Sequence, residues 1–226
     1  MRIVLFDMDG VLVRIRSSWE YLHQYFGVLR EAREIMRKFE EGEISYLEWM
    51  EEDTSLWIRA RGRVHITELI RALEKVPIDE DAPLVARELH RRGVMIGIVS
   101  GGIDLLARRV AREIGADVWM ANKLLFDKRG YLVPGGAPLV GVDKRRAVAR
   151  ILGEYGVRPE EAMFVGDSKW DASAMRVVGY PVAYGDSCPV LLNIARCRVR
   201  RLREVVSLVD EVEKMGDCPS YRIERV

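Results

Sequence analysis

The segment Arg2–Val13 limits most strongly how this chain can fold. Its apolar run, Ile3–Phe6, is followed at once by Asp7, Asp9 and Gly10. A short apolar run bounded by a turn signal predicts a buried strand of a parallel sheet. Open α/β sheets bind ligands at the carboxyl ends of their strands, so we expect both carboxylates to lie where chemistry takes place. Two carboxylates at this spacing can hold a hard cation and still offer one oxygen as a nucleophile.

The length and charge of the chain narrow its class. With 226 residues it is long enough for one domain that carries a sizeable insertion. Its 36 basic and 35 acidic residues give a net charge of +1, which argues against a protein that binds nucleic acid or a membrane surface. No apolar run has the length of a membrane span and no signal peptide is visible, so we expect a cytoplasmic protein.

The three cysteines lie late in the chain, at Cys188, Cys197 and Cys218. Their odd number and the lack of a CxxC spacing argue against both a disulfide framework and a zinc site. We therefore expect three reduced thiols.

Residues 14–77 carry no strand-like run and show helical spacing instead. Apolar residues recur at three- and four-residue steps in four stretches, which predicts four helices. Ser45 and Glu48 form a capping box that opens the third of them. We expect residues 14–77 to form an all-helical cap domain, whose helices end at or before these residues: Gly27, Gly42, Gly62 and Pro77.

From residue 78 onward, strand and helix patterns alternate, which is typical of a doubly wound parallel sheet. We assign residues 1–13 and 78–215 to an α/β core and residues 216–226 to a C-terminal tail that is loose or pairs as a strand. The predicted helices after the cap are Asp81–Arg92, Ile103–Ile114, Asp143–Tyr155, Trp170–Val178 and Leu202–Met215. The predicted strands are Val94–Val99, Val118–Ala121, a hairpin within Lys123–Val133, Ala162–Val165, Pro181–Tyr184 and Arg198–Arg200.

Polar residues gather at or near the predicted strand ends in a pattern that suits phosphoryl transfer, which needs positioning and charge neutralisation. Asp7 and Asp167 offer the hard oxygens that Mg²⁺ prefers. Asp9 can protonate a leaving alkoxide and later deprotonate the hydrolytic water. For the phosphate, we expect donors from the Ser100 hydroxyl, the amides of Gly101 and Gly102 at a helix N-terminus, and the Lys144 ammonium.

The segments DMDGVLV, IVSGG, Lys144 and GDSKWD resemble, in this order, the four motifs of the haloacid-dehalogenase (HAD) superfamily of phosphohydrolases. The phosphoserine-phosphatase-like branch is the most similar, because the order of VSGG, the hairpin after ANK and the helical cap matches. The resemblance covers most of residues 1–215 and implies a Rossmann-like core.

The resemblance also implies roles for individual residues. Asp7 would be the nucleophile of an aspartyl-phosphate mechanism and Asp9 its acid and base. Mg²⁺ would be held by Asp7, Asp9 and Asp167, with Asp171 orienting the waters of the metal or the Lys144 side chain. The phosphate would be bound by Ser100, Gly101 and Lys144.

The cap departs from that family pattern. Phosphoserine phosphatases of the family place a Glu on the substrate amine and an Arg on its carboxylate, and by motif spacing these positions fall at Arg16 and Asp53 here. Both charges are reversed, so we expect the clamp for phosphoserine to be lost and Arg16 to meet an anionic group. Tyr46 aligns with a cap aromatic of the family. In the last motif Trp170 replaces the usual Asn, which affects one contact to phosphate or to a metal-bound water.

Each motif also has a simpler interpretation when taken alone. Asp-x-Asp-Gly is also a turn or a fragment of a calcium loop, and Lys144 alone is also a solvated surface lysine. Asp171 can be a first-turn helix charge that the dipole stabilises. The cap aromatics Trp19, Tyr46, Trp49 and Trp57 are favoured as core residues. We assign no role to His23, His65 or His90.

The combination of motifs predicts a magnesium-dependent phosphomonoester hydrolase that acts on a small phosphorylated metabolite. Phosphoserine phosphatase proper and transfer of the phosphate to another acceptor remain open. Two alternatives of other classes are a phospho-accepting signalling domain, which the length and the large insertion oppose, and a non-catalytic protein that binds a phosphometabolite. The substrate and the oligomeric state stay open.

Overall fold

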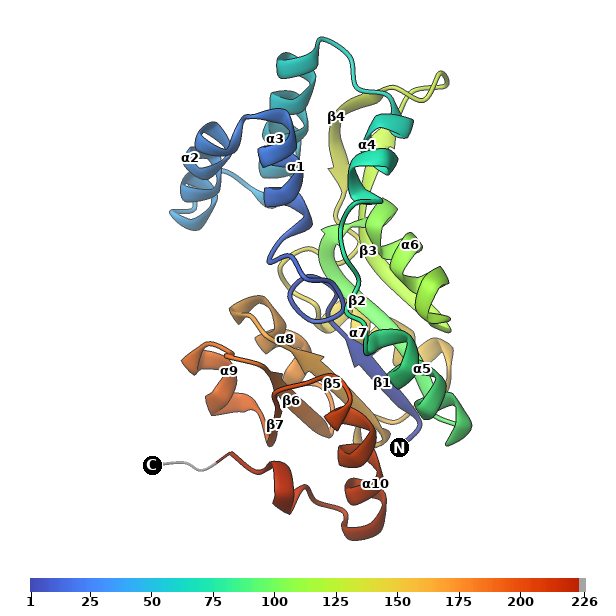
Figure 1. Cartoon of the computed structure of the whole chain (residues 1–226). Coiled ribbons are helices and arrows are strands. Elements are labelled where there is room, and N and C mark those ends of the chain that lie inside the picture. The colour runs from blue at the N-terminus through green and yellow to red at the C-terminus, as the bar shows by residue number, and fades with distance from the viewer. Residues whose placement is uncertain (224–226) are drawn as a thin grey trace.

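A computed structural model describes residues 1–223 and contains a seven-stranded sheet in the order β4-β3-β2-β1-β5-β6-β7 (Figure 1). Neighbouring strands pair in parallel except for β3 and β4, which form an antiparallel hairpin. The predicted doubly wound α/β fold is therefore confirmed. The strands are β1 Ile3–Phe6, β2 Met95–Ile103, β3 Val118–Phe126, β4 Leu132–Ala137, β5 Ala162–Gly166, β6 Tyr180–Tyr184 and β7 Cys197–Val199.

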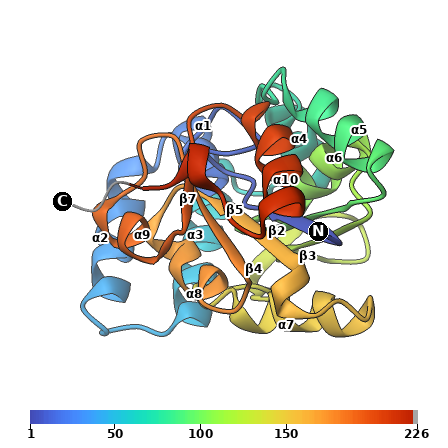
Figure 2. The ribbon, with the colours of Figure 1, turned by 90° about the horizontal axis from the view of Figure 1, so that it is seen from below.

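Helices cover both faces of the sheet (Figure 2). Because side chains alternate along a strand, Val4 and Phe6 of β1 join the core on one face and Ile3 and Leu5 join the core on the other. All four are buried, as expected for a central strand of a parallel sheet. The first face carries α5 Ala82–Arg91, α6 Asp104–Ile114 and α10 Glu204–Met215; the second carries α7 Arg145–Glu154, α8 Ala172–Met175 and α9 Pro189–Ile194.

The register of the central strands brings their carboxyl ends to one edge. Phe6 of β1 pairs with Ile98 of β2 on one side and with Val165 of β5 on the other. The residues that follow these positions therefore leave the sheet together, which places the predicted motifs of three strands side by side.

Residues 14–77, which we call the cap segment, form four helices between β1 and β2: α1 Ser18–Phe26, α2 Leu29–Glu40, α3 Tyr46–Arg61 and α4 Ile66–Leu73. The capping box of Ser45 and Glu48 is present at the start of α3. Helix α3 packs along β4, so the cap segment lies beside the β3–β4 hairpin in the upper part of Figure 1. A division of the chain into core and cap domains stays a prediction.

Several predicted boundaries were wrong, and helix α9 was not predicted. The predicted strand Val118–Ala121 and the first arm of the predicted hairpin form one strand, β3, and β4 continues beyond Val133 to Ala137. Strand β2 continues through Ser100-Gly101-Gly102 to Ile103, because a register irregularity after Val99 lets it pair again with β3 at Asn122. The predicted helix Trp170–Val178 is shorter, with a 3₁₀ turn at Lys169–Asp171 before α8. Further 3₁₀ turns lie at Pro159–Glu161 and Pro219–Tyr221.

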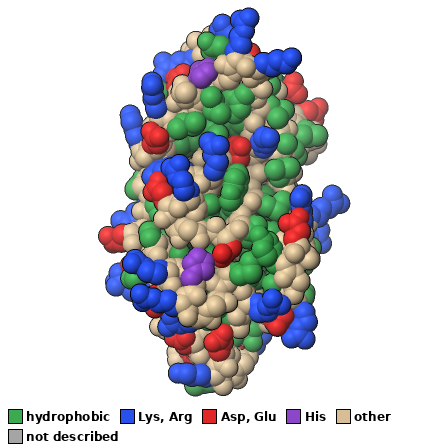
Figure 3. All heavy atoms as spheres, turned by 90° about the vertical axis from the view of Figure 1, so that its right-hand side faces the viewer, with side chains coloured by type: hydrophobic (Ala, Val, Ile, Leu, Met, Phe, Trp, Pro, Cys, Tyr) green, Lys and Arg blue, Asp and Glu red, His purple; other side chains and the backbone are tan. Residues whose placement is uncertain are grey.

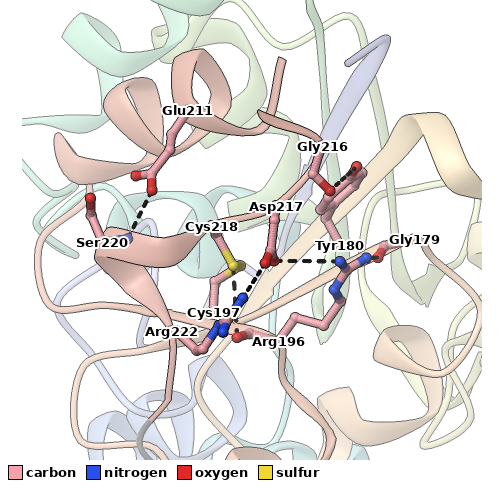
Figure 4. The surroundings of a disulfide bond; sticks show 10 residues. All are labelled: Gly179, Tyr180, Arg196, Cys197, Glu211, Gly216, Asp217, Cys218, Ser220 and Arg222. Carbon is pink, nitrogen blue, oxygen red and sulfur yellow. Dashed lines mark hydrogen bonds and ion pairs between the residues drawn. A yellow bond between two sulfur atoms is a disulfide. The ribbon is translucent and has the colours of Figure 1, made fainter. Parts of the chain in front are cut away.

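The expectation of three reduced thiols was wrong for two of them. Cys197 in β7 and Cys218 after α10 form a disulfide (Figure 4). After α10 the chain returns to the edge of the sheet, so two cysteines 21 positions apart in the sequence meet. A pattern of local spacing cannot predict such a contact. Cys188 is free.

The disulfide also changes the interpretation of the tail. Residues 216–223 are held by this bond, by a backbone bridge between Cys197 and Arg222 and by a hydrogen bond from Ser220 to Glu211, so they are not loose (Figure 4). Residues 224–226 of the predicted tail lie outside the described residues.

The face of the molecule that carries α4, α5 and α6 shows no dominant charge (Figure 3). On this face, hydrophobic side chains lie between Lys, Arg and acidic side chains. Among residues 1–223, no helix combines the length and the apolar character that a membrane crossing requires.

Candidate active site

A cavity of about 710 Å³ lies between the cap segment and the carboxyl edge of the sheet. Predicted residues from both parts line it. The sheet edge contributes Asp7, Asp9, Ser100, Gly101 and Lys144, and the cap segment contributes Arg16, Tyr46 and Asp53. The remaining predicted residues, Asp167 and Asp171, lie next to Asp7.

Lys144 is a buried cation between two carboxylates. Its Nζ lies 2.8 Å from Oδ1 of Asp7 and 2.6 Å from Oδ1 of Asp171. Burial alone lowers the pKa of Lys144, but the charges of Asp171 and Asp7 outweigh burial and raise it overall. The interpretation of Lys144 as a solvated surface lysine is wrong, since the side chain is 2% exposed and charged.

Both oxygens of Asp171 are already engaged by the protein. Oδ1 accepts from Lys144, and Oδ2 accepts from the backbone amides of Asp167 and Ser168 and from the Ser168 hydroxyl. Asp171 therefore orients Lys144 and shapes the turn after β5, and it is more than a solvated first-turn helix charge.

Asp9 is held by a residue that the sequence analysis missed. Its Oδ2 accepts from both the backbone amide and the hydroxyl of Ser18, at 2.7 and 2.8 Å. Its Oδ1 is buried without a hydrogen-bond partner. Burial raises the pKa of Asp9, and the bonds from Ser18 lower it in part. A carboxyl group with a raised pKa and one free oxygen can exchange a proton with a neighbouring ligand.

The carboxylates beside Lys144 fit a bound metal ion. Ligand atoms of Asp7, Asp167 and Asp171 lie within 4.8 Å of one another. Oδ1 of Asp167 is buried without a hydrogen-bond partner, as expected for an oxygen that is a metal ligand. A β-carbon at Gly10, where φ is 80°, would collide with the Asp167 carboxylate, so glycine leaves room for this group. The Asp9 carboxylate is not part of this cluster, and a metal-binding role for Asp9 stays a prediction.

The carboxylates of this cluster are at least partly buried and repel one another, and a bound cation would remove this repulsion. Burial and the charge of Asp171 raise the pKa of Asp7 well above its ordinary value, against the opposing effect of Lys144. Burial and the charge of Asp171 also raise the pKa of Asp167 to about 6. The donor set of hard carboxylate oxygens suits Mg²⁺.

The expected phosphate donors are only partly available. The prediction that the amide of Gly102 lies at a helix N-terminus was wrong. Gly102 belongs to β2, and its amide donates to Oγ of Ser100 at 3.0 Å. The Ser100 hydroxyl accepts this bond, so its own proton can still be donated to a ligand. Ser100 and Lys144 therefore remain the principal candidates for binding a phosphate.

Asn122 is a second residue that the sequence analysis missed. Its amide nitrogen donates to the Tyr46 hydroxyl and to the Gly101 carbonyl, both at 2.7 Å, and its amide oxygen accepts from the backbone amides of Val140 and Gly141. It thus ties Gly101 of β2 to Tyr46 of the cap segment. The available signal was a polar Asn directly after the predicted strand Val118–Ala121, at the sheet edge where ligands bind. Only the structure shows that this Asn is fully buried and therefore needs several partners.

Three of the four cap aromatics line the cavity: Trp19, Tyr46 and Trp49. Trp19 and Trp49 also pack against the hydrophobic core, as predicted. Trp19 donates its indole N–H to the Gly101 carbonyl at 3.1 Å. Trp57 is fully buried and stacks on Trp19, so its assignment to the core is confirmed. Trp170, the departure from the family motif, also lines the cavity.

The two charged cap positions differ in exposure. Arg16 is exposed at the cavity, whereas Asp53 is only 2% exposed and lies beside His23. His23, to which the sequence analysis assigned no role, also lines the cavity. Its Nε2 lies 3.4 Å from Oδ2 of Asp53. The reason it was missed is that its partner lies thirty positions away along the chain, on another helix.

Residues 1–179 match the model of a protein family described as haloacid dehalogenase-like hydrolase. The chain is 26% identical to the phosphoserine phosphatase of Methanocaldococcus jannaschii over 92% of this chain and 97% of that protein. It is 28% identical to the phosphoserine phosphatase of Archaeoglobus fulgidus, over 86% of this chain and 55% of that protein. A solved structure of a phospho-aspartyl intermediate analogue of phosphoserine phosphatase superposes with a TM-score of 0.76 at 25% identity, covering 91% of this chain and 97% of that chain.

Proposed function

The chain belongs to the haloacid dehalogenase-like hydrolase family, and from this premise we propose that it is a magnesium-dependent hydrolase of small phosphomonoesters that works through an aspartyl-phosphate intermediate. The predicted membership of the superfamily and the prediction of a phosphatase are both confirmed by the family match and the relatives. The metal, the residue roles and the substrate are our proposal.

The observation that carries the proposal is the placement of Asp7 and Asp9 at one cavity beside a buried cation. Lys144 and the backbone amide of Met8 hold Oδ1 of Asp7, each at 2.8 Å, which fixes the orientation of the carboxylate. Asp7 attacks phosphorus, the bond from phosphorus to the ester oxygen breaks, and Asp9 delivers its proton to the leaving alkoxide.

The second half of the reaction reverses the proton transfer. Asp9, now ionised, takes a proton from water, which attacks the phosphorus of the phosphorylated Asp7 and releases inorganic phosphate. Lys144 and the Ser100 hydroxyl hold the phosphoryl oxygens through both steps. The aromatic cap residues around the cavity restrict the access of other water molecules.

Asp7 and Asp167 would hold the magnesium ion, since Asp171 is engaged by protein donors. When bound, Mg²⁺ supplies positive charge that offsets the repulsion between the carboxylates and the anionic phosphate.

The test is release of phosphate from p-nitrophenyl phosphate and from a panel of small phosphomonoesters, with Mg²⁺ and with EDTA. We expect release that requires Mg²⁺ and is lost in Asp7→Asn, while Asp186→Asn, a change at a carboxylate that is 99% exposed, leaves it unchanged. Acid quenching during turnover should trap a protein whose mass is increased by one phosphoryl group, in wild type only. Binding of esters without release from any of them would instead support a non-catalytic binding protein.

Phosphoserine phosphatase proper is the second candidate, favoured by the names of the relatives. Phosphoserine therefore belongs in the panel. A kcat/KM for phosphoserine far above that of all other esters would show that the reversed charges at Arg16 and Asp53 still accommodate its amino and carboxylate groups.

A further inference from the structure

The active-site chemistry leaves one buried charge unexplained. Asp53 is 2% exposed and lines the cavity, and its Oδ1 is buried without a hydrogen-bond partner. Buried carboxylates are normally paired with a cation or satisfied by several donors, because desolvation is costly. Among residues 1–223, no Lys or Arg lies within ion-pair distance of Asp53, and His23 is its one potential ionic partner.

His23 does not supply the missing charge. The indole N–H of Trp57 donates to Nδ1 of His23 at 3.0 Å, so Nδ1 acts as an acceptor and carries no proton. The hydrogen-bond network thus assigns a neutral imidazole whose proton is on Nε2, facing Oδ2 of Asp53. One oxygen of Asp53 meets a neutral donor and the other meets none.

Aromatic rings surround the space beside this carboxylate. Trp49 and Tyr46 line the cavity at 5.5 Å between ring centroids. Phe39 packs against both rings, at 4.5 Å from Trp49 and 5.7 Å from Tyr46. Burial raises the pKa of Asp53, and the nearby indole N–H of Trp49 lowers it in part. This N–H has no hydrogen-bond partner within the protein. A carboxylate among aromatic faces is the environment that attracts an ammonium group.

Tyr46 connects this site with the phosphate end of the cavity. Burial raises the pKa of Tyr46 to about 12, and the charges of both Asp53 and Lys144 act on its hydroxyl. A ligand that passes Tyr46 therefore spans from the cation of Lys144 to the anion of Asp53. Such a ligand is negative at one end and positive at the other.

The arginines of α2 that line the cavity do not compete for Asp53. Arg33 pairs with Glu20, and Arg37 pairs with Glu34 and Glu41. Their charges are offset by these acidic partners, and both side chains are more than half exposed.

Building on the proposed function, we propose that the substrate is a phosphomonoester of an amino alcohol, and that Asp53 binds its ammonium group within the aromatic walls of the cavity. The phosphate lies at Lys144 and Ser100, and the ammonium group supplies the counter-charge that the protein does not provide. Asp53 is then a specificity-determining residue with no part in bond breaking.

The test compares three esters of the same size: phosphoethanolamine, 2-hydroxyethyl phosphate and phosphoglycolate, which carry a cation, a neutral hydroxyl and an anion. In wild type we expect kcat/KM for phosphoethanolamine to exceed that for 2-hydroxyethyl phosphate by about 10- to 100-fold, the usual effect of a hydrogen bond to a charged group. In Asp53→Asn this ratio should fall to near one through a rise in KM for phosphoethanolamine. Glu52→Gln removes the same charge at an exposed neighbouring position on α3 and should leave the ratio unchanged.

A second readout separates a binding role from a structural one. Because the ligand-free protein buries an unpaired carboxylate, Asp53→Asn should melt at the same temperature as wild type or higher, whereas loss of a structural ion pair would lower it. Ethanolamine should also inhibit the hydrolysis of p-nitrophenyl phosphate competitively in wild type and not in Asp53→Asn.

The outcomes distinguish this inference from the proposed function. Equal selectivity in wild type and Asp53→Asn, or a preference for phosphoglycolate, overturns the amino-alcohol substrate while the hydrolase proposal stands. If no ester releases phosphate, the proposed function fails, and calorimetric binding of phosphoethanolamine to Asp7→Asn and to Asp7→Asn/Asp53→Asn decides the role of Asp53. Equal affinities there would overturn the inference.

Discussion

The ammonium group of Lys144 lies 2.6 Å from Oδ1 of Asp171, and neither side chain is more than 2% exposed. The second oxygen of Asp171 accepts hydrogen bonds from the backbone amides of Asp167 and Ser168 in the turn after β5. One carboxylate therefore connects the Lys144 cation to the turn that carries Asp167. The charge at the catalytic edge and the shape of this turn are therefore coupled.

Lys144→Met should destabilise the protein by about 3–5 kcal/mol, because it leaves the buried carboxylates of Asp7 and Asp171 without their cation. It should also abolish phosphate release. Chemical denaturation monitored by tryptophan fluorescence measures the first effect. The control is Lys169→Met, which removes an exposed lysine, and an equal loss of stability in both variants would contradict the coupling.

Ser18→Ala should lower kcat about tenfold with little change in KM, because Asp9 loses its hydroxyl donor and is less well oriented. Loss of a donor to the ionised form raises the pKa of Asp9, so the limb of the pH–rate profile that reports Asp9 should move to higher pH. Ser17→Ala removes the N-cap of α1 instead. It should cost about 1 kcal/mol of stability and leave that limb in place.

Because of Asp167, the free energy of unfolding of the metal-free protein should decrease as the pH is raised from 4 to 6. The pKa of Asp167 is raised from 3.8 to about 6 in the folded state, so the folded protein binds more protons than the unfolded chain in this range, and stability decreases as the pH rises through it. Asp167→Asn removes this penalty. In EDTA at pH 7 it should be about 1–2 kcal/mol more stable than wild type, with no difference below pH 4.

Thermal unfolding at several pH values, with Asp186→Asn as the exposed control, measures this effect. Addition of Mg²⁺ should then stabilise wild type and not Asp167→Asn, since only wild type retains the ligand. Stabilisation of both proteins by Mg²⁺ would place the metal elsewhere.

Reduction of the Cys197–Cys218 disulfide should lower stability by about 3 kcal/mol, the loop-closure contribution of a bond between residues 21 positions apart. Neither cysteine lines the cavity, so kcat and KM should stay unchanged. Melting with and without reductant checks this, and Cys188→Ser should behave as wild type under both conditions. A loss of activity on reduction, at a temperature where the protein remains folded, would link the tail to the active site.

Much of the fold follows from local pattern alone. The apolar run Ile3–Phe6, the capping box at Ser45 and the breakers at Gly27 and Gly62 act on neighbouring residues, so the sequence was sufficient to predict the central strand and the helices of the cap segment. The motif order also led to the correct family, since chemistry at the carboxyl edge of a parallel sheet needs polar residues directly after strands.

Only the tertiary structure decided the contacts between residues that are far apart in the chain. Ser18 holds Asp9 from the first cap helix, Asn122 ties Gly101 of β2 to Tyr46, and the disulfide closes the tail. Each depends on where two elements meet in space, which no spacing along the chain reports.

The charge state around Asp53 is the sharpest example of this division. The sequence placed an acidic residue in the cap, but a carboxylate on a solvated helix and a buried one have different chemistry. Burial, the Trp57 hydrogen bond that keeps His23 neutral and the absence of a cation among residues 1–223 near Oδ1 arise only when α1 and α3 pack together. The sequence determined which groups are present, and packing decided which of them are left to bind a ligand.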